Sequence, residues 1–473
     1  MKTTSVDRIA RDGRARTGRA IAAITAAAAL AVVGPPGPAS AQEGGHAEVT
    51  FNRDVMPILQ ANCQECHQEN SIAPMALMTY RDAYRWASGI REKVSNRVMP
   101  PWHIDRTVGI REFKNDRSLT DEEIETIVAW IDGGRVEGDP ADLPPPAEFP
   151  DPNEWRLADE FGQPDLIVGS EPFTLDAVTQ DKWWRPVTPV DLDEPRWVKA
   201  IEIKPAGLDS RRITHHVLAF LEQDESDDAM SPGAVQASTR GGAMGGPGLF
   251  MEWAVGKEGE VFPDGAGKLM LPNSQIRWEV HLHAIGKQVP DSYVELGVWF
   301  YPKGQEPTHR TRLAFYNATK PGGLDIPPGE IAVTQNFHTL RWPARIENFQ
   351  PHMHMRGKAF SLEAITPDGE RTLISQVNNF QWNWHINYIY DEDVAPLLPA
   401  GTTLVVTAWH DNTPDNPNNP DHEQWVDWGD RTVDEMAHLW ADVTYLDQEE
   451  YDRLVAERRR IAEEESNEEG DDR

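Results

Sequence analysis

The feature that most constrains this 473-residue chain is its cysteine content. Only two cysteines occur, Cys63 and Cys66, and they stand three positions apart. A pair this close cannot join distant segments, so a disulfide framework is excluded and apolar cores must hold the fold. A chain of this length is too long for one core, which predicts two or three domains. The cysteine pair therefore needs a chemical explanation of its own.

His67 directly follows the pair and completes the pattern Cys-x-x-Cys-His. This pattern is typical of haem c attachment, in which both thiols add to the haem vinyl groups and the histidine ligates the iron. A redox dithiol and half of a zinc site are the competing interpretations. The chain has no second thiol pair for zinc, and no thioredoxin-like strand precedes the motif. We expect one covalent haem c held by Cys63, Cys66 and His67.

The second axial ligand is predicted from the methionines downstream. A methionine ligand raises the iron potential and suits electron transfer. Met99 begins a Met-Pro-Pro sequence that resembles the ligand loop of small class I cytochromes c. We therefore predict Met99 as the ligand, with Met75 as the second candidate and His103 as the third.

The first 41 residues have the pattern of a cleaved signal peptide. Six basic residues precede the apolar run Ala20–Val33, and Ala39-Ser40-Ala41 forms a small-x-small site before Gln42. A transmembrane anchor is the alternative, but the run is short and mostly alanine. We expect a periplasmic or secreted protein with no stable membrane insertion. Cleavage would remove six basic and two acidic residues, a net +4, which takes the charge from −32 to −36. The strongly negative charge of the chain would repel nucleic acid, which argues against nucleic acid as a partner.

The rest of the chain divides by composition, and the predicted fold class is mainly β with an α-helical N-terminal domain. Residues 42–137 are predicted to form the cytochrome c domain, with a helix that begins at Asp121 after the cap Thr120. Residues 138–164 are a proline-rich acidic linker, and 448–473 an acidic helical tail.

Residues 165–447 alternate short β-forming runs with Pro, Gly, Asn and Asp turns, which indicates β-sandwiches. We predict two of them, at 165–322 and 323–447, with a seam at Pro321–Gly329. Gly233–Gly248 is predicted to be a mobile loop. The runs predicted as strands are Trp197–Ile203, Ile213–Leu221, Ile276–His283, Val294–Tyr301, Leu313–Phe315, Phe360–Ile365 and Leu404–Trp409.

Three histidine groups lie in this β region. His352 and His354 are two apart, so on a strand both imidazoles share a face and can reach one metal. His215 and His216 are neighbours, and joint ligation by them needs a bulge or a strand end. The third group contains His281, with a further histidine two positions on. A thioether such as that of Met436 beside imidazoles selects copper, especially Cu(I), over zinc.

The order of these groups carries a resemblance. His-His, then Val-His, then His-x-His ahead of Arg-Gly-Lys, then Asp-Glu-Met is similar to the copper type II, ascorbate-dependent monooxygenases. This family includes peptidylglycine α-hydroxylating monooxygenase and dopamine β-monooxygenase. Asp411–Met436 also resembles bacterial members fused to cytochromes, and the likeness covers about residues 165–447. The eukaryotic members carry many disulfides, which this chain cannot form.

The resemblance implies two jelly-roll-like sandwiches that face each other across a cleft, with one copper on each. It implies an electron-transfer copper held by His215, His216 and His281, with His283 as the alternative to His281. It implies a catalytic copper held by His352, His354 and Met436, and His410 or His438 would be tested next if Met436 were not a ligand. The remaining histidines, His385 among them, we interpret as surface or core residues.

Together the two halves predict an exported haem c/dicopper monooxygenase that hydroxylates a C–H bond with O2. The haem domain would relay electrons from ascorbate, another small reductant or a redox partner protein. The substrate would be a small molecule or a peptide, and its class is not carried over because the family's substrate-orienting residues have no match here. The alternatives are a non-catalytic haem–copper electron-transfer or redox-sensing protein, and a cytochrome tethered to a binding module.

Overall fold

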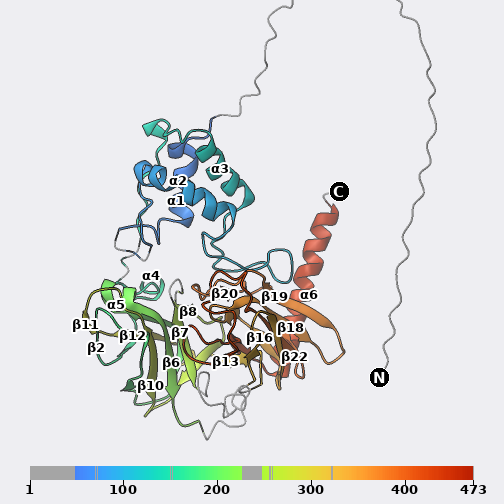
Figure 1. Ribbon diagram of the computed structural model, residues 1–473. Coiled ribbons are helices and arrows are strands. Elements are labelled where there is room, and N and C mark those ends of the chain that lie inside the picture. Colours follow the sequence, from blue (N-terminus) through green and yellow to red (C-terminus); the bar gives the residue numbers. More distant parts are fainter. Residues whose placement is uncertain are drawn as a thin grey trace, which may run out of the picture. The chain divides into compact units, whose positions relative to one another are not determined.

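The computed structural model describes residues 48–471, with gaps at 70, 72, 150, 152, 226–247, 255, 256, 258, 321 and 322, and with side chains described up to residue 464. The predicted signal peptide lies outside the described residues, as does the predicted glycine-rich loop apart from Gly248. Figure 1 shows the helices of the N-terminal part and the β-strands that follow them in the chain. Among the described residues, no helix has both the length and the apolar character needed to cross a bilayer.

The N-terminal part of the described chain is helical. It contains a π-helix, η1 (Phe51–Val55), followed by α1 (Met56–Asn62), α2 (Tyr80–Ser95) and α3 (Asp121–Asp132). Thr120 accepts a hydrogen bond from the backbone N–H of Glu123, whose carboxylate accepts one from the N–H of Thr120. This capping box explains why α3 begins where the sequence predicts. The helices pack on a shared apolar core that includes Phe51, Leu59, Ile127 and Trp130.

Most of the remaining chain is β-structure, and overall 35% of the residues are in strands and 18% in helices. All seven predicted strand runs coincide with observed strands. Two short helical turns, η2 (Pro140–Asp142) and α4 (Ala158–Phe161), precede the first strand. The first half contains β1 (Leu166–Gly169), β2 (Phe173–Leu175), β3 (Lys182–Trp184), β4 (Val187–Pro189), β5 (Arg196–Pro205), α5 (Gly207–Ile213), β6 (Thr214–Glu222), β7 (Leu249–Ala254), β8 (Glu260–Val261), β9 (Ala266–Met270), β10 (Gln275–Leu282), β11 (Val289–Ser292) and β12 (Val294–Phe300).

The second half ends in the charged helix that the sequence predicts, α6 (Gln448–Asp471). Its strands are β13 (His309–Asn317), β14 (Asp325–Ile326), β15 (Ile331–Thr339), β16 (Ala344–Ile346), β17 (Asn348–His352), β18 (Gly357–Ile365), β19 (Arg371–Val377), β20 (Tyr388–Ile389), β21 (Leu397–Leu398), β22 (Thr403–Asp411), β23 (Val426–Asp427) and β24 (His438–Tyr445).

Three sheets position the histidines. A five-stranded sheet has the order β3-β10-β6-β7, with β4 also on β10. It shares an apolar core with strands β1, β5 and β12 of an 11-stranded sheet. A four-stranded sheet, β15-β22-β18-β19, shares a second core with β16, β17 and β24 of the same large sheet. The small pairs β2-β11 and β14-β23 complete the described β-structure.

The large sheet runs through both predicted sandwiches. Its path is β1-β12-β5-β9-β13-β24-β16-β21. Strand β13 lies within residues 165–322, but it pairs with β24 along its length, from Arg310 opposite Tyr445 to Asn317 opposite His438. A short parallel contact between β13 and β9 links the two halves. Strand pairing therefore joins the first half of the β region to the second.

Candidate metal centre

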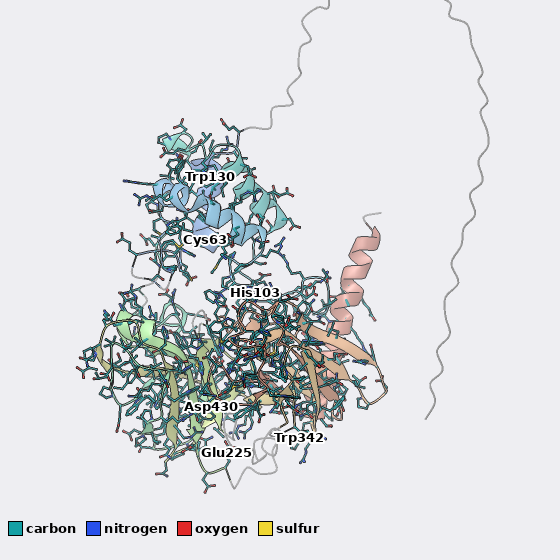
Figure 2. All side chains as sticks on the ribbon, in the orientation of Figure 1. Cys63, His103, Trp130, Glu225, Trp342 and Asp430 are labelled. Atoms are coloured by element: carbon teal, nitrogen blue, oxygen red, sulfur yellow. The ribbon has the colours of Figure 1, made fainter. Side chains whose placement is uncertain are left out.

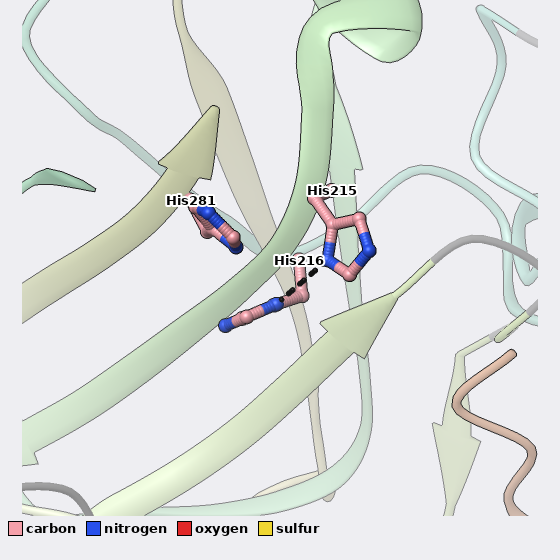
Figure 3. A group of neighbouring side chains, drawn as sticks. All are labelled: His215, His216 and His281. Atoms are coloured by element: carbon pink, nitrogen blue, oxygen red, sulfur yellow. Dashed lines mark hydrogen bonds between the residues drawn. The ribbon is translucent and has the colours of Figure 1, made fainter. Parts of the chain in front are cut away.

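The first histidine group lies at the ends of β6 and β10. His215, His216 and His281 each offer a ring nitrogen, and these atoms lie within 4.8 Å of one another (Figure 3). His216 faces His281 in the β6–β10 register, whereas the next partner of β10 is Thr214. His215 is therefore the extra residue of a β-bulge, which turns neighbouring side chains towards one site. The structure contains the bulge that joint ligation by these neighbours requires.

His281, and not His283, belongs to this group. The ring centre of His283 lies 6.5 Å from that of His215, and His283 is not among the three clustered residues. Trp183 on β3 stacks on the His281 ring at 4.6 Å with an interplanar angle of 2°. Asp181 Oδ2 lies 3.4 Å from His281 Nε2.

The second group lies where β17 meets β24. His352, the last residue of β17, pairs with His438 in an antiparallel register. The pairing ends at His352 and His438, and the same register continued by two residues would place His354 opposite Met436. Alternate residues of a regular strand share a face, so such a register would put all four side chains on one face. The ring centres of His352 and His354 are 5.3 Å apart, and all four residues are buried.

Buried polar contacts hold the loop that carries His354. The Glu435 carboxylate accepts hydrogen bonds from the backbone N–H of His354 at 2.9 Å and of Arg356 at 2.6 Å. The Arg356 guanidinium donates to Asn412 Oδ1 and to the carbonyl of Val433, both at 2.9 Å. The Arg-Gly-Lys and Asp-Glu-Met sequences are thus in contact. Glu435 fixes the backbone at His354 and Arg356, and Arg356 fixes the backbone at Val433.

The imidazoles of both groups are electrically neutral. Burial lowers the pKa of His281 and of His354 to about 4. Burial also lowers the pKa of His216 and His352 well below the usual range, and neighbouring histidines lower both further. Neutral imidazole is the form that binds metal ions. Neutral nitrogen donors together with the Met436 thioether suit copper better than a hard cation.

The structure brings two further histidines to these groups. On the sequence alone, His438 is kept as an alternative to Met436, whereas His385 is interpreted as a surface or core residue. His385 lies between β19 and β20, and its Nδ1 is 2.9 Å from His352 Nδ1. His438 stacks on His352 with ring centres 4.7 Å apart. Both ring nitrogens of His438 lack a hydrogen-bond partner within the described part of the chain. The sequence around His385 contains no ligand spacing that would have identified it.

The Cys-x-x-Cys-His motif forms a turn after α1. Cys63 follows the last residue of α1, and the His67 N–H donates to the Cys63 carbonyl at 2.9 Å (Figure 2). Cys63 and Cys66 are not joined to each other by a disulfide, and burial raises the pKa of Cys63 to about 12. His67 Nδ1 lies 3.1 Å from the Met75 carbonyl oxygen. This contact fixes the ring and leaves Nε2 for a metal, the arrangement typical of ligating histidines. These features fit attachment of a haem.

The two methionine candidates lie in different settings. Met75 contributes its backbone carbonyl to His67, the expected proximal ligand. Met99 lines a cavity of about 770 Å³ together with Val94, Leu119 and Ile124 of the helical part. His103 lines the same cavity, whereas Cys63, Cys66 and His67 do not. Met99 therefore lies among the residues that line this cavity, and Met75 does not.

Comparisons with known proteins give no family. No protein-family model and no curated protein matches the chain. Among solved structures, the VP2 subviral particle of infectious bursal disease virus is 10% identical, with a TM-score of 0.15, over 61% of this chain and 74% of that chain. The Gt strain of the same virus is 10% identical, with a TM-score of 0.16, over 63% and 74%. Likeness at these scores carries no argument about fold or function.

Proposed function

We propose that this protein is an exported haem c/dicopper monooxygenase that hydroxylates a C–H bond with O2. The balanced reaction is R–H + O2 + 2 e⁻ + 2 H⁺ → R–OH + H2O. One observation supports it most directly: His215, His216 and His281 cluster as neutral imidazoles beside a second group, His352 and His354, in which the continued register adds Met436. This order of ligands is the one in which the chain resembles the copper type II monooxygenases.

The two donor sets suit different tasks. His215, His216 and His281 offer nitrogen donors alone, which fits a copper that only exchanges electrons. His352 and His354 with Met436 offer two nitrogens and a soft sulfur, a set that favours Cu(I). When bound, copper supplies dioxygen activation and the haem supplies a one-electron store.

This chain's own residues position those donors. Glu435 and Arg356 hold the His354 loop. His410 fixes the backbone at Met436, because its Nε2 lies 3.0 Å from the Met436 carbonyl oxygen. Trp183 stacks on His281 and covers one face of that ring, which keeps water away from it.

The haem would be held by Cys63 and Cys66 through thioethers and by His67 and Met99 as axial ligands. The segment after Met99 packs on the second half of the β region, where Ile104 bridges Val377 and Phe113 bridges Tyr390. Such a tether keeps an electron carrier at high effective concentration near the copper ligands. Ascorbate or another external donor would supply the electrons.

A non-catalytic electron-transfer protein is the second candidate, and the burial of the ligands favours it. His216, His281, His352 and His354 are each no more than 8% exposed. A substrate would have to reach donors that the fold covers closely. Electron exchange has no such requirement.

Oxygen-isotope transfer distinguishes the two candidates. The full-length protein, loaded with haem and copper and reduced with ascorbate, is supplied with ¹⁸O2 and a panel of small apolar and peptide substrates. The monooxygenase is expected to place one ¹⁸O atom in a product for every two electrons consumed, as measured by mass spectrometry. His354→Ala is the matched control and should yield no labelled product. Oxygen reduced only to peroxide, with no labelled product from any substrate, would leave the electron-transfer role.

A further inference from the structure

The two histidine groups are not separate in the fold, and His385 lies between them. Its ring centre is 4.5 Å from that of His352, 5.5 Å from that of His215 and 5.6 Å from that of His216. His385 is 5% exposed, and it comes from the irregular segment between β19 and β20. One buried imidazole therefore contacts both donor sets.

The spacing of the nitrogen atoms is that of metal ligands. His352 Nδ1 and His385 Nδ1 are 2.9 Å apart, and His215 Nδ1 and His216 Nδ1 are 3.1 Å apart. Metal–imidazole bonds of about 2.0–2.1 Å that meet at a right angle bring two ring nitrogens to about 2.9 Å from each other. Each pair thus has the spacing of two neighbouring ligands on one ion.

We propose that His385 is a copper ligand that pairs with His352, and that the two histidine groups form a single dinuclear copper centre. One ion would be held by His215, His216 and His281, and the other by His352 and His385 together with His354 and Met436. The inference rests on the copper loading of the proposed function, and it adds a ligand that the family pattern does not contain.

A hydrogen bond between the two imidazoles is the simpler explanation of the 2.9 Å contact between His352 and His385. It requires one ring to donate and the other to accept. It does not explain why the rings of His215 and His216 also converge on His385 from the other half of the β region. A second metal ion explains both contacts, because ligands from the two halves must meet where two ions lie side by side.

The test compares His385→Asn with His338→Asn in the full-length protein, each loaded with Cu(II) alone. His338 is the matched control: it is half-buried on β15, with Nε2 2.9 Å from the Asn317 carbonyl oxygen, and it is remote from the clusters in the strand order. Elemental analysis should find two copper ions in wild type and in His338→Asn, and one or none in His385→Asn. Unchanged copper content and an unchanged electron paramagnetic resonance spectrum in His385→Asn would overturn the proposal.

Two further measurements keep the test decisive. If His385→Asn does not fold, His385→Phe keeps a ring of similar size and should also lose copper. In wild type, two adjacent cupric ions should broaden each other's resonance, whereas two sharp, independent signals would count against a dinuclear centre. If His385 is needed for copper but ¹⁸O never enters a product, only the proposed function fails. If labelled product forms while His385→Asn keeps both coppers, only this inference fails.

Discussion

The imidazole rings of His216 and His352 lie 6.1 Å apart, although they belong to strands β6 and β17 in different halves of the β region. The family resemblance implies two coppers on either side of a cleft, and their ligands share no residue. In this fold the two sets are neighbours. Loss of a ligand from one histidine group should therefore change the copper bound by the other group.

We predict that His216→Ala lowers copper by about one equivalent and also changes the spectrum of the copper that remains. The reason is contact: the removed ring borders both His352 and His385. Metal analysis and electron paramagnetic resonance of the Cu(II)-loaded variant measure both effects. An unchanged signal from the remaining ion would mean that the two sites are independent, as the sequence alone suggests.

A substitution at Met436 tests whether this residue is a copper ligand or a core residue. Met436→Ile keeps an apolar side chain of similar bulk, so the free energy of unfolding should change by no more than about 1.5 kcal/mol. Substrate-coupled oxygen uptake should fall by orders of magnitude, because the sulfur donor is lost. Met353→Ile is the control, since Met353 is fully buried in the apolar core one position after His352. If Met436→Ile unfolds the chain with copper content intact, His438 becomes the first alternative ligand.

The haem ligand can be assigned by a pair of alanine variants. Met99→Ala should abolish the weak red absorption band that marks methionine ligation in ferric haem c. Met75→Ala should keep the band, because Met75 contacts His67 through its backbone carbonyl, which alanine retains. Absorption spectra of the two ferric variants decide the matter. Loss of the band in Met75→Ala alone would move the ligand to Met75.

A buried ion network near the centre predicts an unusual dependence of stability on pH. Lys257 and Lys268 contact three carboxylates at 2.6–3.4 Å, those of Glu252, Glu260 and Asp442. Three acids face two bases, so one negative charge is in excess. Burial raises the pKa of Glu252, and it raises that of Asp442 to about 6. The folded network therefore holds a proton that the unfolded chain releases.

The sign follows from proton linkage. Above the ordinary glutamate pKa of about 4.3, the folded state binds more protons than the unfolded state, so the free energy of unfolding falls as pH rises through the folded pKa. We predict that Glu252→Gln, which removes the excess charge, is more stable relative to wild type at pH 8 than at pH 5. Denaturant unfolding at both pH values measures it, and Glu125→Gln on exposed α3 is the control. An equal effect of Glu252→Gln at both pH values would show that Glu252 is ionised throughout.

The sequence predicted features that depend on local patterns. The seven strands were predicted from short runs of β-forming residues between turns. The start of α3 was predicted from the cap residue Thr120. The need for a bulge or a strand end at His215 and His216 followed from strand geometry, because neighbours on a regular strand point to opposite faces. Each of these depends on residues close together in the chain.

The features that were missed depend on contacts between distant segments. His385 meets His352 and His215 only because an irregular segment folds back over β17. Glu252, Lys257 and Glu260 have the charges of surface residues, yet tertiary packing buries them in one network. The pairing of β13 with β24 joins residues more than a hundred positions apart. The local periodicity of apolar residues in the sequence does not indicate such contacts.

The most direct measurement is the metal content of the full-length protein purified from the exported fraction. We predict one iron, as haem that stays bound in acid–acetone and on denaturing gels, and two copper ions per chain. Cys63→Ala with Cys66→Ala should remove the iron and leave the copper. A chain that carries iron but no copper, or zinc in its place, would contradict the central claim that the histidine groups form a copper centre.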